Sequence, residues 1–200
     1  MNINMLFPQP VADFTLGRAF TKEELRVMLH DSGRRPNGMN ETSTDCYVLE
    51  RKELAGLKTF VEQCVEEYAR AVWHVQDDCH LKLTQSWVNY TQPGAAHRRH
   101  IHANALYSGV LYIQTDAERD KIHFYRHELS TMRPKYSEWN QFNAHSWWLP
   151  TETGSLLLFP STMEHAVEQV PAGVERCSLA FNVFPTNILG DYAALTEVRI

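Results

Sequence analysis

The spacing of apolar side chains changes near residue 80 of the chain. Before it, residues 52–73 repeat apolar side chains every three or four positions, which predicts an amphipathic helix. The apolar stripe consists of Leu54, Leu57, Val61, Cys64, Val65, Tyr68 and Val72. A shorter stripe follows Thr21 and Glu24, whose spacing is that of a helix-capping box. We therefore expect two amphipathic helices within a helical annex over about 20–76.

After residue 80 the chain consists of short segments rich in β-branched and aromatic residues, separated by turn signals. These segments are LKLTQSWVNYTQ, YSGVLYIQT, KIHFYRH, SWWLP, GSLLLFPS, HAVEQV and RCSLAFNVFP. Short strands without helical periodicity between them predict an antiparallel sandwich or barrel. The expected fold class is α+β, mainly β: a jelly-roll core over about 80–185 with the helices packed on its outside, in one domain spanning 1–200.

Two polar segments interrupt this pattern. Residues 33–45 are rich in Gly, Pro and Asn, and we expect a loop there. Residues 128–146 form a long polar and aromatic excursion between strands, and such loops are often functional lids. The large aromatic residues at 136, 139, 147 and 148 could cover a peptide or a small molecule, or they could pack on the outer sheet.

Composition and charge narrow the possible classes of protein. The net charge of -5 and the pI near 6.0 argue against a mainly electrostatic nucleic-acid binder. The first residues lack the pattern of a signal peptide, and no apolar run is long enough to span a membrane. Four cysteines lie far apart without a CxxC motif, which favours reduced thiols over disulfides or a zinc site. We expect a cytoplasmic protein.

Three histidines lie within six residues in AAHRRHIHANALYSGVLYI. In a β-strand the side chains of His100 and His102 would project from the same face, which suits two ligands of one metal. His165 follows a Pro-Ser turn at the start of another predicted strand and could supply a third ligand. Imidazole ligands suit several transition metals, so the sequence predicts a metal site.

Arg176 and Ser178 alternate on a predicted strand whose other residues are apolar. A buried guanidinium needs an anionic partner, and a carboxylate is its best match. That partner could be a bound ligand or an internal Asp or Glu, and the sequence leaves both interpretations open.

The spacing of His100-x-His102, SGVLYI, GSLLLFPSTMEH and ERCSLAFN resembles the iron(II)/2-oxoglutarate-dependent oxygenase superfamily. More narrowly, it is similar to the small prolyl-hydroxylase-like group of bacteria and phages, over roughly residues 85–184. The resemblance implies a double-stranded β-helix. It also implies an iron(II)- and 2-oxoglutarate-dependent dioxygenase that consumes O2, releases succinate and CO2, and hydroxylates an unidentified small molecule or peptide.

The resemblance also implies roles for individual residues. Iron(II) would be bound by His100, His102 and His165. The distal carboxylate of 2-oxoglutarate would be bound by Arg176 and Ser178, with Tyr112 and Asn89 lining its pocket. No catalytic residue beyond the metal centre is expected. Apolar walls made by Leu156, Leu158 and Phe181 would exclude water from the site.

One position departs from the pattern of the superfamily. His102 stands where most members have Asp or Glu, so three neutral imidazoles would leave the full +2 charge on the iron. His97, an acid of the segment 116–120, or Asn104 could replace it as the second ligand. Arg98 and Arg99, between the histidines, could steer an acidic substrate or form a solvated rim.

Two other interpretations share the predicted fold. GAAHRRHIH and GSLLLFPSTMEHAVEQ partly fit the cupin motifs through Gly94, Gly154, Pro160 and His165. That resemblance implies a three-histidine, thiol-dioxygenase-like site in which Arg176 binds a substrate carboxylate. A jelly-roll binding module without catalysis is the other alternative, because a fold alone does not determine function.

Overall fold

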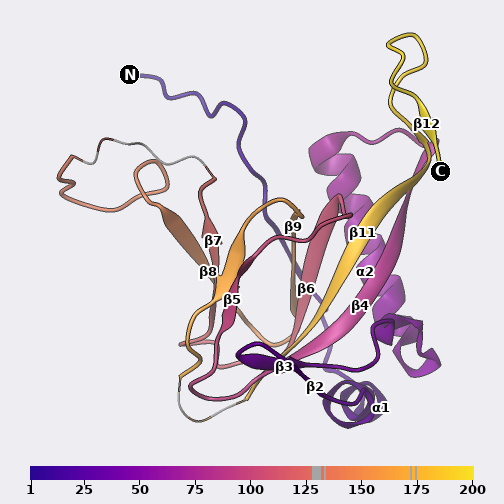
Figure 1. The fold of residues 1–200 in the computed structure, drawn as a ribbon, viewed down its shortest axis with the longest axis vertical. Helices are drawn as coiled ribbons and strands as arrows, with labels where there is room; N and C mark the ends of the chain where they lie inside the picture. Colours follow the sequence, from indigo (N-terminus) through magenta and orange to yellow (C-terminus); the bar gives the residue numbers. More distant parts are fainter. Residues whose placement is uncertain (128–131, 133, 172, 174) are drawn as a thin grey trace.

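The computed structural model describes residues 1–127, 132, 134–171, 173 and 175–200. Two antiparallel sheets pack face to face (Figure 1). The large sheet has the order β1 (Ala12–Thr15), β9 (Ser155–Pro160), β6 (Tyr107–Gln114), β11 (Arg176–Leu189), β4 (Cys79–Thr91), β3 (Asn40–Thr42) and β2 (Arg35–Asn37), and β12 (Val198–Arg199) pairs with β11. The small sheet has the order β5 (His97–His100), β10 (His165–Val167), β7 (Lys121–Tyr125) and β8 (Ser146–Pro150). This architecture confirms the predicted fold class.

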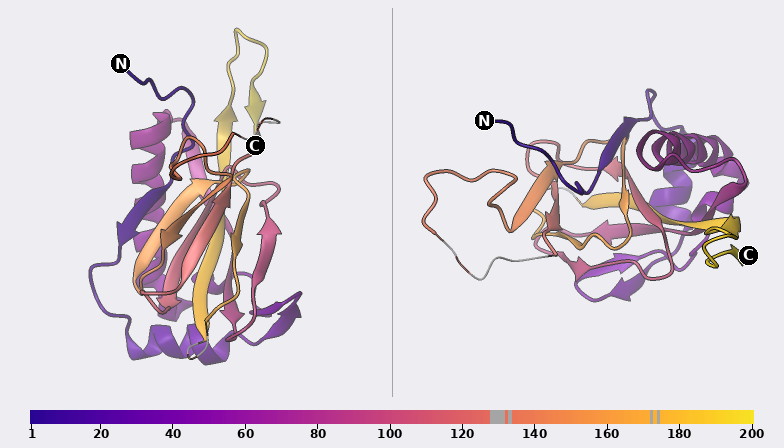
Figure 2. Two further views of the ribbon diagram at one scale, coloured as in Figure 1. Left: turned by 90° about the vertical axis from the view of Figure 1, so that its left-hand side faces the viewer. Right: turned by 90° about the horizontal axis from the view of Figure 1, so that it is seen from above.

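Helices cover the outer face of the large sheet (Figure 2). The first is α1 (Lys22–Arg26), which continues as a π-helical turn, η1 (Val27–Asp31), and begins with the predicted capping box at Thr21 and Glu24. The second runs from the short turns η2 (Val48–Glu50) and η3 (Lys52–Leu54) into α2 (Ala55–Tyr68) and η4 (Ala69–Trp73). The predicted apolar stripe is buried against the sheet from Leu54 to Tyr68, which confirms this helix, whereas its last predicted member, Val72, is exposed.

The alternation of side chains along β11 divides the large sheet into two faces. Leu179, Phe181 and their odd-numbered neighbours point outward into the core shared with the helices. The even-numbered residues, which include Arg176 and Ser178, therefore point toward the small sheet. Between the sheets lies a second apolar cluster, formed by Val110, Tyr112, Ile122, Phe124, Leu157 and Phe159.

This division corrects the predicted walls of the site. Leu156, Leu158 and Phe181 belong to the outer core under the helices, so they do not line the space between the sheets. Leu157 and Phe159, one position further along β9, face that space instead. Strands buried on both faces have continuous apolar runs in sequence, so the inward-facing set could not be chosen from the apolar pattern.

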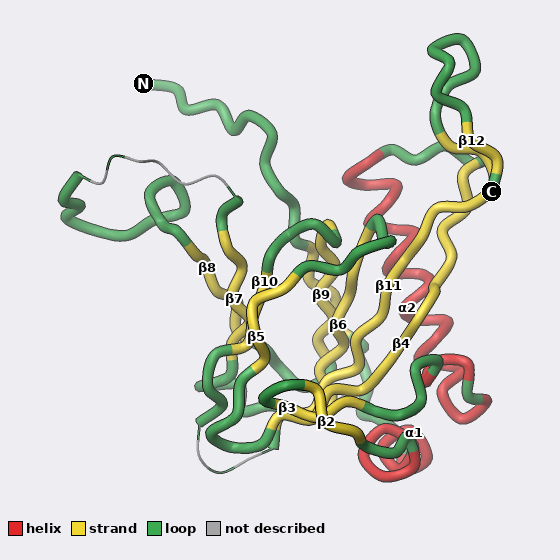
Figure 3. The backbone as a smooth tube through the Cα atoms, in the orientation of Figure 1, coloured by secondary structure: helices red, strands yellow, loops and turns green. Residues whose placement is uncertain are grey.

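The predicted loop over 33–45 is also corrected, because it contains the hairpin of β2 and β3 (Figure 3). Gly38 and Met39 form the two-residue turn between the two strands, and Gly38 has a positive φ of 68°, which is the conformation that a hairpin turn with glycine at its first position requires. The strands β1, β5 and β12 extend the predicted set. Of the excursion 128–146, residues 128–131 and 133 lie outside the described residues.

The four cysteines, at positions 46, 64, 79 and 177, carry free thiols, as predicted. Across the described residues, every helix is too short or too polar to cross a membrane.

Gly109 on β6 is required by close packing against β11. A Cβ atom built at this position would lie 2.2 Å from the Phe181 ring. We expect Gly109→Ala to lower the free energy of unfolding by about 1–3 kcal/mol, the usual cost of overpacking a core. Gly56→Ala in α2 is the matched control, because its added Cβ would meet nothing closer than 3.7 Å. Urea unfolding should show a gain for the control, and equal stability of the two variants would contradict this packing.

Candidate metal centre and co-substrate site

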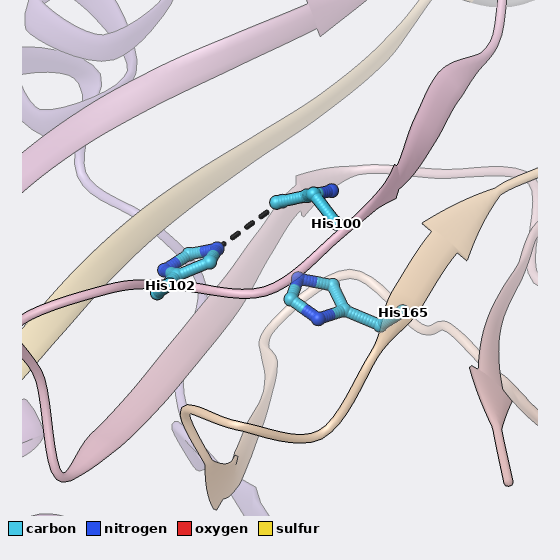
Figure 4. Close-up of side chains that lie close together, drawn as sticks. All are labelled: His100, His102 and His165. Carbon is cyan, nitrogen blue, oxygen red and sulfur yellow. Dashed lines mark hydrogen bonds between the residues drawn. The ribbon is translucent and has the colours of Figure 1, made fainter. Parts of the chain in front are cut away.

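Three histidines converge beside the small sheet, two from its neighbouring strands β5 and β10 and one from the segment that follows β5 (Figure 4). His100 ends β5 and His165 begins β10, and the two are direct cross-strand partners. His102 approaches them from the segment after β5. One ligand nitrogen from each ring lies within 4.8 Å of the other two. The structure therefore brings together the three residues that the sequence predicted as ligands.

The convergence of His100 and His102 has a different origin from the one predicted. β5 ends at His100, so the two residues do not share the face of a regular strand. His102 is instead fixed by its backbone N–H, which donates to the carbonyl of Ser161 at 3.0 Å. The pairing of β5 with β10 also contains a bulge, in which His97 and His100 oppose Val167 and His165. The extra residue turns His97 onto His100, and their rings stack at 4.5 Å between centroids.

Hydrogen bonds at Nδ1 orient all three imidazoles. The Nδ1 atoms of His100 and His165 lie 2.7 Å and 3.0 Å from the carbonyl oxygens of Arg98 and Met163. His102 Nδ1 lies 2.6 Å from Oδ1 of Asn182. Because these carbonyl oxygens only accept, each Nδ1 carries the proton and each Nε2 presents a lone pair. This is the tautomer that a metal ligand requires.

The geometry of the Nε2 atoms fits a shared cation. Nε2 of His100 and Nε2 of His102 lie 3.2 Å apart. Two nitrogens bound to one ion at about 2.1 Å would be separated by roughly 3.0–3.4 Å for angles between 90° and tetrahedral. Two lone pairs that face each other at this distance repel unless a cation lies between them. The donor set therefore fits iron(II), for which imidazole is a suitable ligand.

Burial keeps these imidazoles neutral. It lowers the pKa of His165 to about 3, and the neighbouring His100 contributes to the same shift. Burial also lowers the pKa values of His100 and His102. The ring of Phe159 packs edge-on against His165 at 4.8 Å between centroids. Neutral imidazoles in an apolar wall can bind a metal without first losing a proton.

The alternative second ligands lie outside this cluster. His97 stacks on His100, but among the described residues the group whose ligand atoms converge contains only His100, His102 and His165. Asp120 is buried in the turn between β6 and β7, where its carboxylate accepts the backbone N–H of Asp116 at 2.9 Å. Asn104 is exposed in a turn. The geometry therefore favours His102 as the second ligand.

Asn182 is a site residue that the sequence analysis missed. It lies on β11, opposite Ser108 of β6. Its Oδ1 accepts from both His102 Nδ1 at 2.6 Å and the Ser108 hydroxyl at 2.9 Å. A polar amide within the apolar run SLAFNVF was the available signal. Asn182 fixes the ring of the histidine that replaces the usual acid.

We expect Asn182→Leu to weaken metal binding by about 10–100-fold, the usual effect of losing a residue that orients a metal ligand. Asn182→Asp should restore much of the affinity, because a carboxylate oxygen can accept the same proton from His102. Thr186→Ala, at a half-buried position further along the same strand, is the control. Titration of each variant with iron(II) under anaerobic conditions measures the effect. An unchanged affinity of Asn182→Leu for iron(II) would show that Asn182 does not orient His102 for metal binding.

Four predicted co-substrate residues form one polar group between the sheets. Ser178 of β11 pairs with Asn89 of β4 on one side and with Tyr112 of β6 on the other. Cross-strand partners share a face, so these three side chains lie in a row, with Arg176 two positions along β11. The Arg176 guanidinium lies 5.2 Å from the centroid of the Tyr112 ring. The structure thus brings together all four residues.

Polar atoms in this group are buried without partners. Among the described residues, the buried side-chain atoms that lack a hydrogen bond include Arg176 Nε, Tyr112 Oη and Asn89 Oδ1. Buried polar atoms are rarely left unpaired, so a missing ligand is the simplest explanation. Burial raises the pKa of Tyr112, although the nearby Arg176 opposes the shift, so the phenol stays protonated and can donate. The group therefore fits an anionic ligand that accepts hydrogen bonds.

The sequence left open whether Arg176 pairs with a bound ligand or with an Asp or Glu of the protein itself, and the structure favours the ligand. Arg176 is only 3% exposed, yet no described Asp or Glu forms an ion pair with it. The adjacent Glu175 pairs with Arg34 at 2.6 Å instead. A buried cation without a protein counter-charge favours a bound carboxylate as its partner.

Residues 85–182 match the sequence model of a family described as "Putative 2OG-Fe(II) oxygenase". The matched segment contains the three histidines and the four polar residues of the co-substrate group. Over these residues the chain belongs to the 2OG-Fe(II) oxygenases, and the predicted resemblance is confirmed. The protein is an oxygenase of the iron(II)- and 2-oxoglutarate-dependent class. Curated proteins gave no match.

Solved structures share the fold at low sequence identity. A prolyl-4-hydroxylase from Pseudomonas putida has 15% identity and a TM-score of 0.57, with 88% of this chain and 92% of that chain covered. An oxidoreductase of the 2OG-Fe(II) oxygenase family from Burkholderia pseudomallei has 12% identity and a TM-score of 0.59, with coverage of 87% and 84%. HygX from Streptomyces hygroscopicus, solved with nickel, 2-oxoglutarate and hygromycin B, has 10% identity and a TM-score of 0.60, with coverage of 89% and 84%.

Proposed function

We propose that this oxygenase hydroxylates a small molecule or a peptide, with His100, His102 and His165 binding iron(II). Arg176, Ser178, Tyr112 and Asn89 would bind the distal carboxylate of 2-oxoglutarate. The observation that carries the assignment is the pairing of two sites: a cluster of three oriented imidazoles, and a buried arginine without a protein counter-ion. We also place the protein in the cytoplasm, which is compatible with its four free thiols.

Iron(II) held by the three histidines would supply the activation of O2 that is coupled to oxidative decarboxylation of 2-oxoglutarate. The protein contributes placement and electrostatics to this chemistry. The Nδ1 hydrogen bonds hold the imidazole rings in one orientation, and Arg176 with Tyr112 fixes the far end of the co-substrate. The inward-facing Val110, Leu157 and Phe159 limit the access of water.

The dianionic co-substrate would supply the negative charge that is lost where His102 replaces the usual Asp or Glu. Three neutral imidazoles place no negative charge beside the ion, so the carboxylate of the bound co-substrate would balance its charge. This arrangement would make metal and co-substrate binding mutually dependent, because each ligand stabilises the charge of the other.

Product analysis tests the proposed reaction. With iron(II) and O2, the protein should convert 2-oxoglutarate into succinate, slowly even when no further substrate is present. Cysteine and similar thiols should not be oxidised. O2 uptake that requires a thiol but not 2-oxoglutarate would instead support a thiol dioxygenase of the cupin type.

A further inference from the structure

A pocket of about 390 Å³ beside the histidines has a charge opposite to that of the whole protein. Its walls come from β2, β3, β4, β5, β11 and the segments next to them. The charged and polar residues that line it include Arg35, Asn37, Gln85, Arg98 and His102. No Asp or Glu is among the described residues that line it, although the chain carries a net charge of -5. The pocket is therefore a cationic region on an acidic protein.

The two arginines of this pocket have no acidic partner among the residues that the structure describes. The guanidinium of Arg35 on β2 donates a hydrogen bond to the Sγ atom of Cys46 at 3.3 Å, and neither Arg35 nor Arg98 forms an ion pair with a described acid. Their sequence neighbours behave differently: Arg34 pairs with Glu175 at 2.6 Å, and Arg99 pairs with Glu164. In each adjacent pair, one arginine is neutralised by the protein and the other faces the pocket uncompensated.

The pocket is distinct from the co-substrate group. Arg176 does not line it, whereas His100 and His102 do. The hairpin of β2 and β3 lies beside β5 (Figure 3), and residues of both line the pocket. Trp87 adds a flat apolar surface, with its ring 5.6 Å from that of His102. A molecule in this pocket would meet the metal ligands on one side and the two arginines on the other.

We propose that the substrate of the oxygenase carries an acidic group, a carboxylate or a phosphate, which Arg35 and Arg98 bind. This inference rests on the proposed function, because it assumes that the pocket beside the histidines receives the substrate. Guanidinium groups bind both kinds of anion through paired, charge-assisted hydrogen bonds. A cationic pocket also concentrates anions from solution. The acidic group would anchor the substrate and leave a C–H bond near the metal ligands.

Binding of matched small probes tests this proposal. The probes are a set of N-acetyl amino acids, the corresponding neutral N-methylamides, and a set of simple alkyl phosphates. Ligand-observed NMR would measure their binding in the presence of saturating 2-oxoglutarate, which occupies the Arg176 site. We expect one or both acidic sets to bind and the neutral amides to bind more weakly. The double variant Arg35→Gln/Arg98→Gln should weaken the acidic probes by roughly tenfold or more.

Arg99→Gln is the matched control. It removes the same charge at the position next to Arg98, from a side chain that is already paired with Glu164. It should leave probe binding unchanged. Binding of carboxylates alone or phosphates alone would support the proposal and identify the acidic group. Equal binding of acids and neutral amides, no binding of any probe, or full binding to the double variant would overturn it.

Measuring the affinity for 2-oxoglutarate distinguishes a failure of this inference from a failure of the proposed function. Calorimetry on the double variant should give the wild-type affinity for 2-oxoglutarate, because Arg35 and Arg98 lie outside the co-substrate group. If wild-type protein does not bind 2-oxoglutarate, the proposed function fails. The acidic probes, tested on the Arg176→Leu background, would then still decide whether Arg35 and Arg98 form an anion site.

Discussion

Replacing His165 with alanine is expected to abolish stoichiometric iron(II) binding. His165 is 7% exposed and lies opposite His100 across β5 and β10, so its loss would leave the ion with two of its three protein ligands. His100→Ala and His102→Ala should have the same effect, because two imidazoles alone bind a metal weakly and without a fixed geometry. Anaerobic titration with iron(II), followed by measurement of bound metal, gives the stoichiometry.

His97→Ala is the matched control for the three ligand variants. His97 belongs to the same strand and stacks on His100, but its ligand atoms lie outside the converging group. It should retain one iron per chain. If His102→Ala bound iron as tightly as wild type while His97→Ala did not, the second ligand would be His97 and the assignment of His102 would be wrong.

Arg176→Leu is expected to remove most of the affinity for 2-oxoglutarate while iron binding survives. Truncation of one partner of a buried, hydrogen-bonded charge pair costs on the order of 2–5 kcal/mol, which corresponds to a loss of about 30-fold to several thousand-fold in affinity. The melting temperature should be unchanged or higher, because the variant removes a buried charge that no described acid compensates. Calorimetry and thermal unfolding on the same preparation measure both effects.

Arg18→Leu provides the contrasting control. Arg18 binds Glu24 through two hydrogen bonds, of 2.9 Å and 2.7 Å, and Glu24 is buried at the start of α1. Its loss should lower the melting temperature and leave the affinity for 2-oxoglutarate intact. An Arg176→Leu variant that behaved in this way, destabilised but still binding 2-oxoglutarate normally, would show that Arg176 has a purely structural role.

The sequence predicted those features that depend on local periodicity. The stripe of α2 and the short β-rich segments gave the mainly β class, and the alternation of Arg176 with Ser178 placed both on one face of β11. The Pro-Ser turn before His165 placed it at the start of a strand, where the structure has it. Such patterns reflect local backbone geometry, so one sequence can show them.

Features that depend on tertiary contacts were not predictable in the same way. The bulge that brings His97 onto His100 arises from the pairing of β5 with β10, and the position of His102 depends on Ser161 in a distant segment. The inward-facing side of β9 could not be chosen because both of its faces are apolar. The hairpin of β2 and β3 did leave a local signal, the glycine at position 38 that opens its turn, but a glycine is equally common in a loop.

The most direct test of the central claim is an anaerobic titration of the protein with 2-oxoglutarate, with and without iron(II). If the three histidines and Arg176 bind the two ends of one metal–co-substrate pair, one 2-oxoglutarate should bind per chain, and iron(II) should increase the affinity. That increase should vanish in His165→Ala, while a weaker affinity due to Arg176 remains. Equal affinity with and without iron(II), or no binding in either case, would contradict the assignment of these residues to an iron(II)/2-oxoglutarate site.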